Sequence, residues 1–280
     1  MDVMDTCNLP APLPRPPSPS VRQSLARVPS LWAALGLIAF YFLLQATSSL
    51  LIALAIGLAT GFIHLQQGAG RVESELQTMM AQADMQAINV VLTVTLAAAL
   101  TLWLTWRRWP QLWSVSRPPG FGFTLPSNRL FLVPAVAVGL AAPLLGGLLT
   151  ELLAHGHAVT QDIQQLGTRT ALPLRVPLVL VVASLGPLVE ELLFRGVLLS
   201  ALLQRWRVGW AVASSSLLFA LAHLPGLQYQ WFALPDLALL ALALAWLRLR
   251  SGSIWPGIVA HGVNNLLAVV AWFVVINPTR

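Results

Sequence analysis

Two adjacent glutamates and an arginine interrupt a long apolar stretch of this chain. Residues 176–203 are apolar enough and long enough to cross a membrane as one helix, yet they contain Glu190, Glu191 and Arg195. Inserting one ionisable residue at that depth costs at least ~2.5–3.5 kcal/mol, so such residues are rare and usually face a partner, a cavity or a reacting group. This cluster therefore constrains the fold more than any other feature of the sequence.

Helix geometry separates the two glutamates. Glu191 and Arg195 are four residues apart with the acid first, which is the favourable order for an ion pair along one helix face. Glu190 is rotated by about 100° from Glu191, so no residue nearby in the sequence neutralises it. A carboxylate without a counterion in a medium of low dielectric constant binds a proton readily, which suits general acid/base chemistry. The alternative is a buried structural pair beside an acid at the membrane interface.

The composition is that of an integral membrane protein. Of the 280 residues, 57% are hydrophobic and 9% are charged, whereas about a quarter of the residues of a soluble domain are charged. All basic residues are arginines, and we interpret the formal charge of +6 as topology information rather than as a nucleic-acid-binding surface. We therefore expect the lipid bilayer, and no nucleic acid, as a partner. With the single cysteine Cys7, no disulfide can form within the chain.

Hydropathy divides the chain into a tail and two membrane regions. Residues 1–29 are rich in proline and serine and are predicted to form a disordered cytoplasmic tail. Residues 30–169 are predicted to hold about three spans and residues 170–276 about four. The predicted spans are residues 31–62, 87–106, 130–153, 176–203, 208–224, 234–247 and 254–276, with the sixth ending at Arg248 and Arg250. The expected fold class is all-α, a polytopic transmembrane helix bundle of about seven spans.

The arginines predict the orientation of these spans. With the N-terminus inside, eleven of the sixteen arginines flank the spans on the inner side and four on the outer side, while Arg195 lies within the membrane. The absence of lysine is typical of a high-GC genome and favours a bacterium. We therefore expect a multi-pass protein of the cell inner membrane with a cytoplasmic N-terminus.

Three further polar residues lie at membrane depth: His223, His261 and Asn265. His261 and Asn265 are four residues apart and share a helix face. At about 1.5 Å per residue from the inner helix ends, Glu190 lies about 21 Å deep, His223 about 20 Å and His261 about 16 Å. These side chains are therefore expected to meet. Asp236, near the outer end of the sixth span, is interpreted as a solvated helix cap.

A carboxylate and two imidazoles that converge in a partly apolar cavity can activate water. Glu190 would take the proton of the water with help from neutral His223, and His261 with Asn265 would donate hydrogen bonds to a tetrahedral oxyanion. The same Glu190, His223 and His261 would equally suit a catalytic zinc with an open fourth position. Taken singly, each of these residues is more often an interhelical hydrogen-bonding group than a catalyst. Their convergence is what favours catalysis.

The late spans carry three motifs that resemble a known family. The motifs are Glu-Glu-x-x-x-Arg at Glu190, Glu191 and Arg195, Phe-x-x-x-His at Phe219 and His223, and His-x-x-x-Asn at His261 and Asn265. In this order, over residues 170–275, they resemble the CPBP intramembrane endopeptidases, which include the type II CAAX prenyl endopeptidases and bacteriocin-processing or abortive-infection proteins. The resemblance implies an all-helical membrane fold and a catalytic domain at residues 170–276.

The same resemblance implies roles for the matching residues. Glu190 and His223 would activate water, His261 and Asn265 would stabilise the oxyanion, and Glu191 with Arg195 would support them. Members of the family are described both as metalloproteases and as metal-independent glutamate proteases, so zinc stays an open cofactor. The implied partner is a membrane-associated protein or peptide substrate.

Three functions are compatible with these residues. The first is an intramembrane endopeptidase. The second is a non-catalytic membrane scaffold or bacteriocin-immunity protein that uses the same polar cluster for helix packing. The third is a transporter that uses Glu190 and the histidines as a proton relay, although the sequence shows none of the internal repeats common in transporters.

Overall fold

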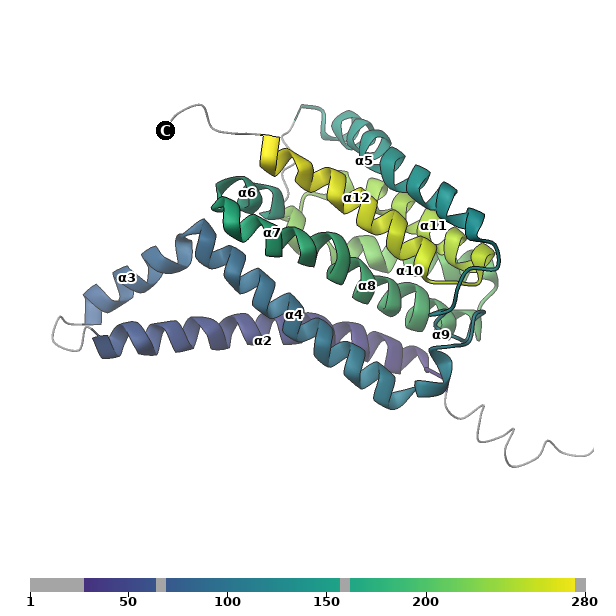
Figure 1. Cartoon of the computed structure of the whole chain (residues 1–280), viewed down its shortest axis with the longest axis horizontal. Coiled ribbons are helices and arrows are strands. Elements are labelled where there is room, and N and C mark those ends of the chain that lie inside the picture. Colours follow the sequence, from purple (N-terminus) through teal and green to yellow (C-terminus); the bar gives the residue numbers. More distant parts are fainter. Residues whose placement is uncertain (1–27, 64–68, 157–161, 275–280) are drawn as a thin grey trace, which may run out of the picture.

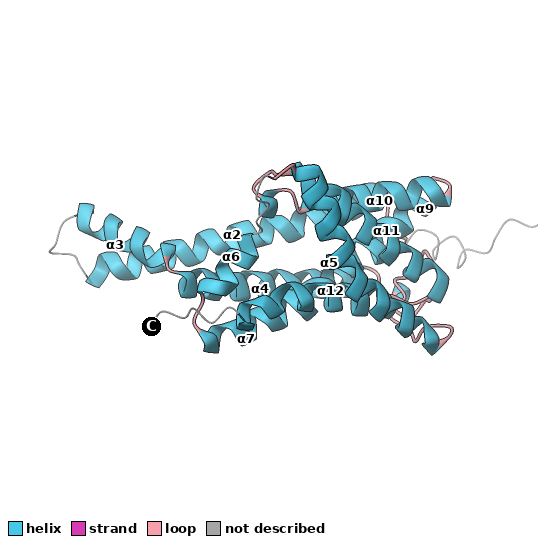
Figure 2. Cartoon of the chain, turned by 90° about the horizontal axis from the view of Figure 1, so that it is seen from above, coloured by secondary structure: helices cyan, strands magenta, loops and turns pink. Residues whose placement is uncertain are grey.

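The structure, a computed structural model, describes residues 28–63, 69–156 and 162–274. In these ranges the protein contains helices and loops but no strand (Figure 2), which confirms the predicted all-α class. The predicted tail, residues 1–29, lies almost wholly outside the described residues. The domain boundary near residue 170 stays a prediction.

Seven helical segments coincide with the seven predicted spans (Figure 1). Five of them are, by length and composition, long and apolar enough to cross a membrane. These are α2 (Leu31–Ile63), α4 (Ala83–Arg108), α5 (Leu132–Ala154), the segment Leu172–Leu203 and α11 (Leu234–Ser251). The short helices η2 (Arg129–Phe131) and η6 (Trp231–Ala233) directly precede α5 and α11. The other two are the apolar helices α10 (Val208–Ala222) and α12 (Trp255–Val274). The protein is therefore a multi-pass membrane protein.

The fourth segment is one continuous helix that contains two π-helical stretches. It runs through α7 (Leu172–Leu180), the π-helical η3 (Val181–Leu185), α8 (Gly186–Glu191), the π-helical η4 (Leu192–Leu198) and α9 (Leu199–Leu203). Pro187 has no N–H to donate to the carbonyl of Ala183, as an α-helix would require. On α12, a Cβ at Gly262 would lie 2.7 Å from this same carbonyl oxygen, so the glycine allows the two backbones to approach closely. Such π-helical turns are frequent at functional sites.

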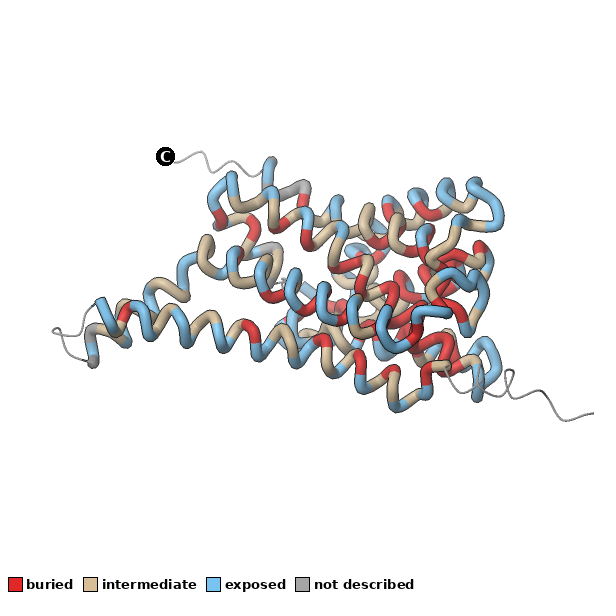
Figure 3. Tube along the Cα trace, turned by 60° about the horizontal axis from the view of Figure 1, so that its bottom comes forward, coloured by how far each residue is buried: buried red, intermediate tan, exposed pale blue. Residues whose placement is uncertain are grey.

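The N-terminal helices form a projecting arm. Helix α2 has 33 residues and is therefore about 50 Å long, so it extends beyond the rest of the bundle together with α3 (Ala69–Ala81) (Figure 1). Helix α4 returns along α2. Buried residues become sparse along the projecting end and are concentrated in the later helices (Figure 3). Helix α3 thus lies in the stretch that separates the first two predicted spans.

The later helices pack closely around the fourth segment. Helix α12 lies along α5, and α11 packs against both α5 and α10. A Cβ at Gly139 of α5 would lie 2.6 Å from the carbonyl oxygen of Ala260, so this contact requires glycine. The main core contains most of η4 and α9 together with Phe219 of α10. The remaining described elements are η1 (Pro110–Leu112), α6 (Asp162–Arg169) and η5 (Pro225–Leu227).

Arg248 corrects one expectation from the sequence. We predicted that the sixth span ends there, at the inner surface, but α11 continues to Ser251 and the Arg248 side chain is fully buried. Its Nη1 donates to the carbonyl oxygen of Ser116 and its Nη2 to that of Gly120, both at 2.7 Å. The loop between η1 and η2 folds over the guanidinium and supplies these acceptors, which the hydropathy pattern does not reveal.

Candidate active site

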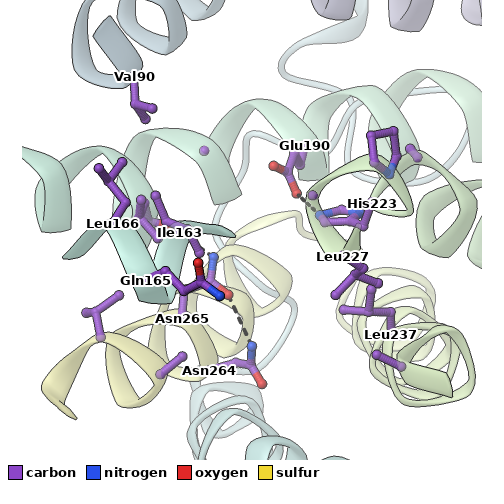
Figure 4. A pocket seen from close by; sticks show the side chains of 18 of the residues that line it. Val90, Ile163, Gln165, Leu166, Glu190, His223, Leu227, Leu237, Asn264 and Asn265 are labelled. Carbon is purple, nitrogen blue, oxygen red and sulfur yellow. Dashed lines mark hydrogen bonds and ion pairs between the residues drawn. The ribbon is translucent and has the colours of Figure 1, made fainter. Parts of the chain in front are cut away.

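A cavity of about 1150 Å³ lies among the helices of the bundle. Its lining comes from α2, α4, α5, α6, the η3–α8 part of the fourth segment, α10, α11 and α12. Glu190, His223, His261 and Asn265 all line it, and Figure 4 shows Glu190 facing His223. The structure therefore brings four of the six predicted site residues to one cavity.

Glu190 lies between the two histidines. It stands near the end of α8, directly before the π-helical η4, and its side chain is 20% exposed. Its Oε2 is 3.5 Å from Nε2 of His223 and 3.8 Å from Nε2 of His261. This Oε2 is buried and has no hydrogen bond to the described residues. One carboxylate oxygen and two imidazole nitrogens thus converge on a small volume of the cavity.

The other ring nitrogen of each histidine is fixed by an acceptor. Nδ1 of His223 lies 2.8 Å from the carbonyl oxygen of Phe219, and Nδ1 of His261 lies 3.2 Å from Oε1 of Glu191. Both acceptors require Nδ1–H to be the donor. In a neutral ring, Nε2 is then an acceptor that faces another acceptor, Oε2 of Glu190. A proton or a water molecule that donates hydrogen bonds to these atoms would satisfy them.

Glu191 and Arg195 form the ion pair predicted from their spacing. Nη1 of Arg195 lies 2.9 Å from Oε1 of Glu191, and at most 1% of either side chain is exposed. Arg195 also donates to the carbonyl oxygen of Ala241 at 3.3 Å, and its guanidinium carbon lies 4.4 Å from the ring centre of Phe219. Because Oε1 of Glu191 also accepts from His261, one buried oxygen connects Arg195 to the site.

Asn265 is anchored by the backbone of the fourth segment. Its Nδ2 donates to the carbonyl oxygen of Val182 in η3 at 2.9 Å, and its Oδ1 accepts from Nδ2 of Asn264 at 3.1 Å. Both asparagines line the cavity (Figure 4). A second N–H of the Asn265 amide stays available, since an amide nitrogen carries two hydrogens.

The donor types of Glu190, His223 and His261 would suit zinc. In the part of the chain that the structure describes, however, no group of three histidine, cysteine, aspartate or glutamate side chains is placed so that it could hold a metal ion.

Two cavity residues are not evident as site residues from the sequence. Tyr41 of α2 is only 3% exposed, lines the cavity, and has no hydrogen bond to the described residues. Asp236 is in the first turn of α11, as predicted, but it is half-buried in the cavity wall rather than fully solvated. Tyr41 lies about 150 residues before Glu190 in a span without a motif, so the only local signal is that it is one of two tyrosines in the chain.

Comparison with known proteins finds one family similarity, in the later part of the chain. Residues 172–267 match the family model described as type II CAAX prenyl endopeptidase Rce1-like. The match begins with α7, ends within α12, and includes all six predicted site residues. No curated protein and no solved structure matches the chain.

Proposed function

We propose that this membrane protein, whose residues 172–267 match the family model of Rce1-like type II CAAX prenyl endopeptidases, hydrolyses a peptide bond of a membrane-associated protein or peptide. The observation that carries the proposal is the convergence of Oε2 of Glu190 with Nε2 of His223 and of His261 in one cavity. The fixed Nδ1–H of each histidine turns the reactive nitrogen towards Glu190.

Glu190 and His223 are positioned to activate water. A water molecule about 2.8 Å from each group would donate one hydrogen to Oε2 of Glu190 and the other to Nε2 of His223. One lone pair of the water oxygen would attack the carbonyl carbon of the peptide bond while Glu190 takes one of the water's protons. Glu190 would then give this proton to the leaving nitrogen, which breaks the C–N bond and regenerates the carboxylate.

His261 and Asn265 are positioned to stabilise the tetrahedral oxyanion. Because Nδ1 of His261 donates to Glu191, Nε2 can donate only when the ring is an imidazolium. Oε1 of Glu191, 3.2 Å away, accepts the Nδ1–H of this ring. Asn265 contributes its second amide hydrogen, while its first holds the side chain on Val182. Electrostatic stabilisation of this kind is usually the largest single contribution to catalysis.

Glu191 and Arg195 are positioning residues in this mechanism. Arg195 neutralises Glu191, and Glu191 orients the ring of His261. Tyr41 adds a hydroxyl to the cavity wall, from which it can donate a hydrogen bond to a charged group of the reaction. The proposed mechanism contains no metal step; Glu190, His223 and His261 are the residues that would hold a zinc ion.

Cleavage of a membrane-peptide library by purified protein in detergent tests the proposal. We expect the wild type to cleave, and Glu190→Gln and His223→Ala to lose at least ~100-fold in rate, since general base catalysis contributes about 10²–10⁴-fold. Glu73→Gln is the matched control: it makes the same chemical change on α3, outside the cavity. If Glu190→Gln cleaves as fast as the wild type, the proposal is wrong, and a scaffold or immunity role explains the polar cluster better.

A strong chelator separates the two chemistries that the family resemblance leaves open. Under the proposed mechanism, the cleavage rate is the same with and without the chelator. A loss of cleavage that added zinc restores would show that Glu190, His223 and His261 rearrange to bind metal, and would contradict the metal-free mechanism.

A further inference from the structure

The cavity wall between α5 and α11 carries a carboxylate that the proposed reaction does not use. Asp236, in the first turn of α11, lines the same cavity as Glu190 and is half-buried. No described residue forms a hydrogen bond or an ion pair with it. Ionisable residues within a membrane protein usually face a partner or a water-filled cavity. Asp236 lines the cavity, and none of the described residues pairs with it.

Two glycines of α5 shape the space around this carboxylate. A Cβ at Gly146 would overlap the carboxyl group of Asp236, so glycine is required for the side chain to lie against α5. A Cβ at the adjacent Gly147 would have no atom within 4 Å, and Gly147 also lines the cavity. The absence of a side chain at Gly146 thus makes room for the carboxyl group, and the absence of one at Gly147 leaves unfilled space on the same helix.

The charges that share the cavity with Asp236 are mainly acidic. Glu151 of α5 and Glu190 of α8 line it, and Arg169 of α6 is the arginine in the described lining. Arg169 forms no ion pair with Asp236, and α6 packs against α4 and α12. Glu151 is exposed and Glu190 already has two histidines beside it. Among the described carboxylates of the lining, Asp236 is therefore the half-buried one that can attract a cation from outside the chain.

The neighbours of Asp236 on α11 suit a long side chain with a charged end. Leu237 and Leu240 line the cavity beside it. Lysine and arginine pack their aliphatic stems against apolar surface while the charged group reaches a polar partner. The volume of about 1150 Å³ exceeds the roughly 300–1,000 Å³ of small-molecule pockets, so it can hold several residues of a peptide.

We propose that Asp236 determines substrate specificity by binding a lysine or arginine side chain of the peptide that is cleaved. This inference rests on the proposed function, because it assigns a subsite to the same cavity. Asp236 does not touch the reacting atoms in this account. It selects the substrate through an ion pair formed away from water, where such a pair is stronger than at an exposed surface.

Matched substrates and an isosteric variant test this inference. A library peptide that is cleaved is synthesised with lysine or with glutamine at each position near the cleavage site, and kcat/KM is measured for wild type and Asp236→Asn. At one position we expect the wild type to prefer lysine by at least ~10-fold, which corresponds to about 1.4 kcal/mol, and Asp236→Asn to reduce this ratio to about one. Asparagine keeps the shape that fits against Gly146, and Glu73→Gln again serves as the control variant.

The outcomes separate this inference from the proposed function. If cleavage depends on Glu190 but the lysine-to-glutamine ratio is the same in wild type and Asp236→Asn at every position, the subsite assignment is wrong and the protease stands. An equal loss of activity on both substrates would indicate a structural role for Asp236 and would also overturn the subsite. If cleavage does not depend on Glu190, both the function and the subsite are wrong.

Discussion

Glu191 connects more of the site than any other residue. Its Oε1 receives Nη1 of Arg195 and Nδ1 of His261, and the side chain is fully buried. We predict that Arg195→Met lowers the free energy of unfolding by about 3–5 kcal/mol, since it leaves a buried carboxylate without its counterion. Thermal unfolding in detergent measures this loss. The double variant Glu191→Gln/Arg195→Met should recover part of it, whereas wild-type stability of Arg195→Met would contradict the account.

Tyr41 is a buried residue of the N-terminal helices that lines the cavity. We predict that Tyr41→Phe lowers kcat by about 10- to 100-fold, because a hydrogen bond to a charged group contributes about 1.5–3 kcal/mol. The melting temperature should change little, since the ring still fills the same space. Tyr229→Phe, at the other and largely exposed tyrosine, is the control. Equal activity of Tyr41→Phe and wild type would remove Tyr41 from the mechanism.

At the scale of the elements, the contact between α12 and η3 sets the position of His261. Gly262 directly follows His261, and a Cβ there would lie 2.7 Å from the backbone oxygen of Ala183. We predict that Gly262→Ala lowers activity by at least ~10-fold, because displacing a catalytic group by a fraction of an ångström misaligns it. Gly36→Ala is the matched control: a Cβ at Gly36 has nothing within 4 Å, so the change should stabilise the protein by about 0.4–1 kcal/mol. Full activity of Gly262→Ala would contradict this role.

The helices themselves could be predicted from the sequence, but their winding could not. Apolar runs between arginines and Pro/Gly-rich loops locate all seven spans, because the bilayer fixes the length of such a run. The π-helical segments η3 and η4 leave no trace in hydropathy, since every residue there is apolar except Ser184 and Arg195. The burial of Arg248 was also missed, because its two carbonyl partners lie about 130 residues earlier in the chain.

At the scale of the whole molecule, the arginines predict which side of the membrane each helix end faces. Cys7 is the only cysteine, so single cysteines can be introduced into a Cys7→Ser protein. Gln82 and Ser114 are both exposed. Gln82 directly precedes α4, and Ser114 lies beyond the other end of α4, after η1. In intact cells, a membrane-impermeant thiol reagent should label Gln82→Cys and not Ser114→Cys. The reverse pattern would invert the predicted topology.

Only the part of the site that the sequence motifs supply could be predicted. Glu190, His223 and His261 lie on spans four, five and seven, and their similar depths along these helices, about 16–21 Å at 1.5 Å per residue, were enough to predict that they meet. The rest of the cavity depends on α2, α4 and α5, which lie outside the matched residues 172–267. Helix packing brings Tyr41 and Gly146, against which the Asp236 carboxyl group lies, to the cavity. No short sequence motif encodes the packing between apolar helices that are distant in the sequence.

Hydrolysis of one identified peptide in ¹⁸O-labelled water tests whether Glu190 activates water for cleavage. The melting temperatures of wild type and Glu190→Gln are first shown to be equal. Each protein is then reconstituted into liposomes with the peptide, and the masses of the products are measured by mass spectrometry. The account predicts two fragments from the wild type, with one ¹⁸O in the new carboxylate, and none from Glu190→Gln. Fragments formed at the same rate by both proteins would contradict it.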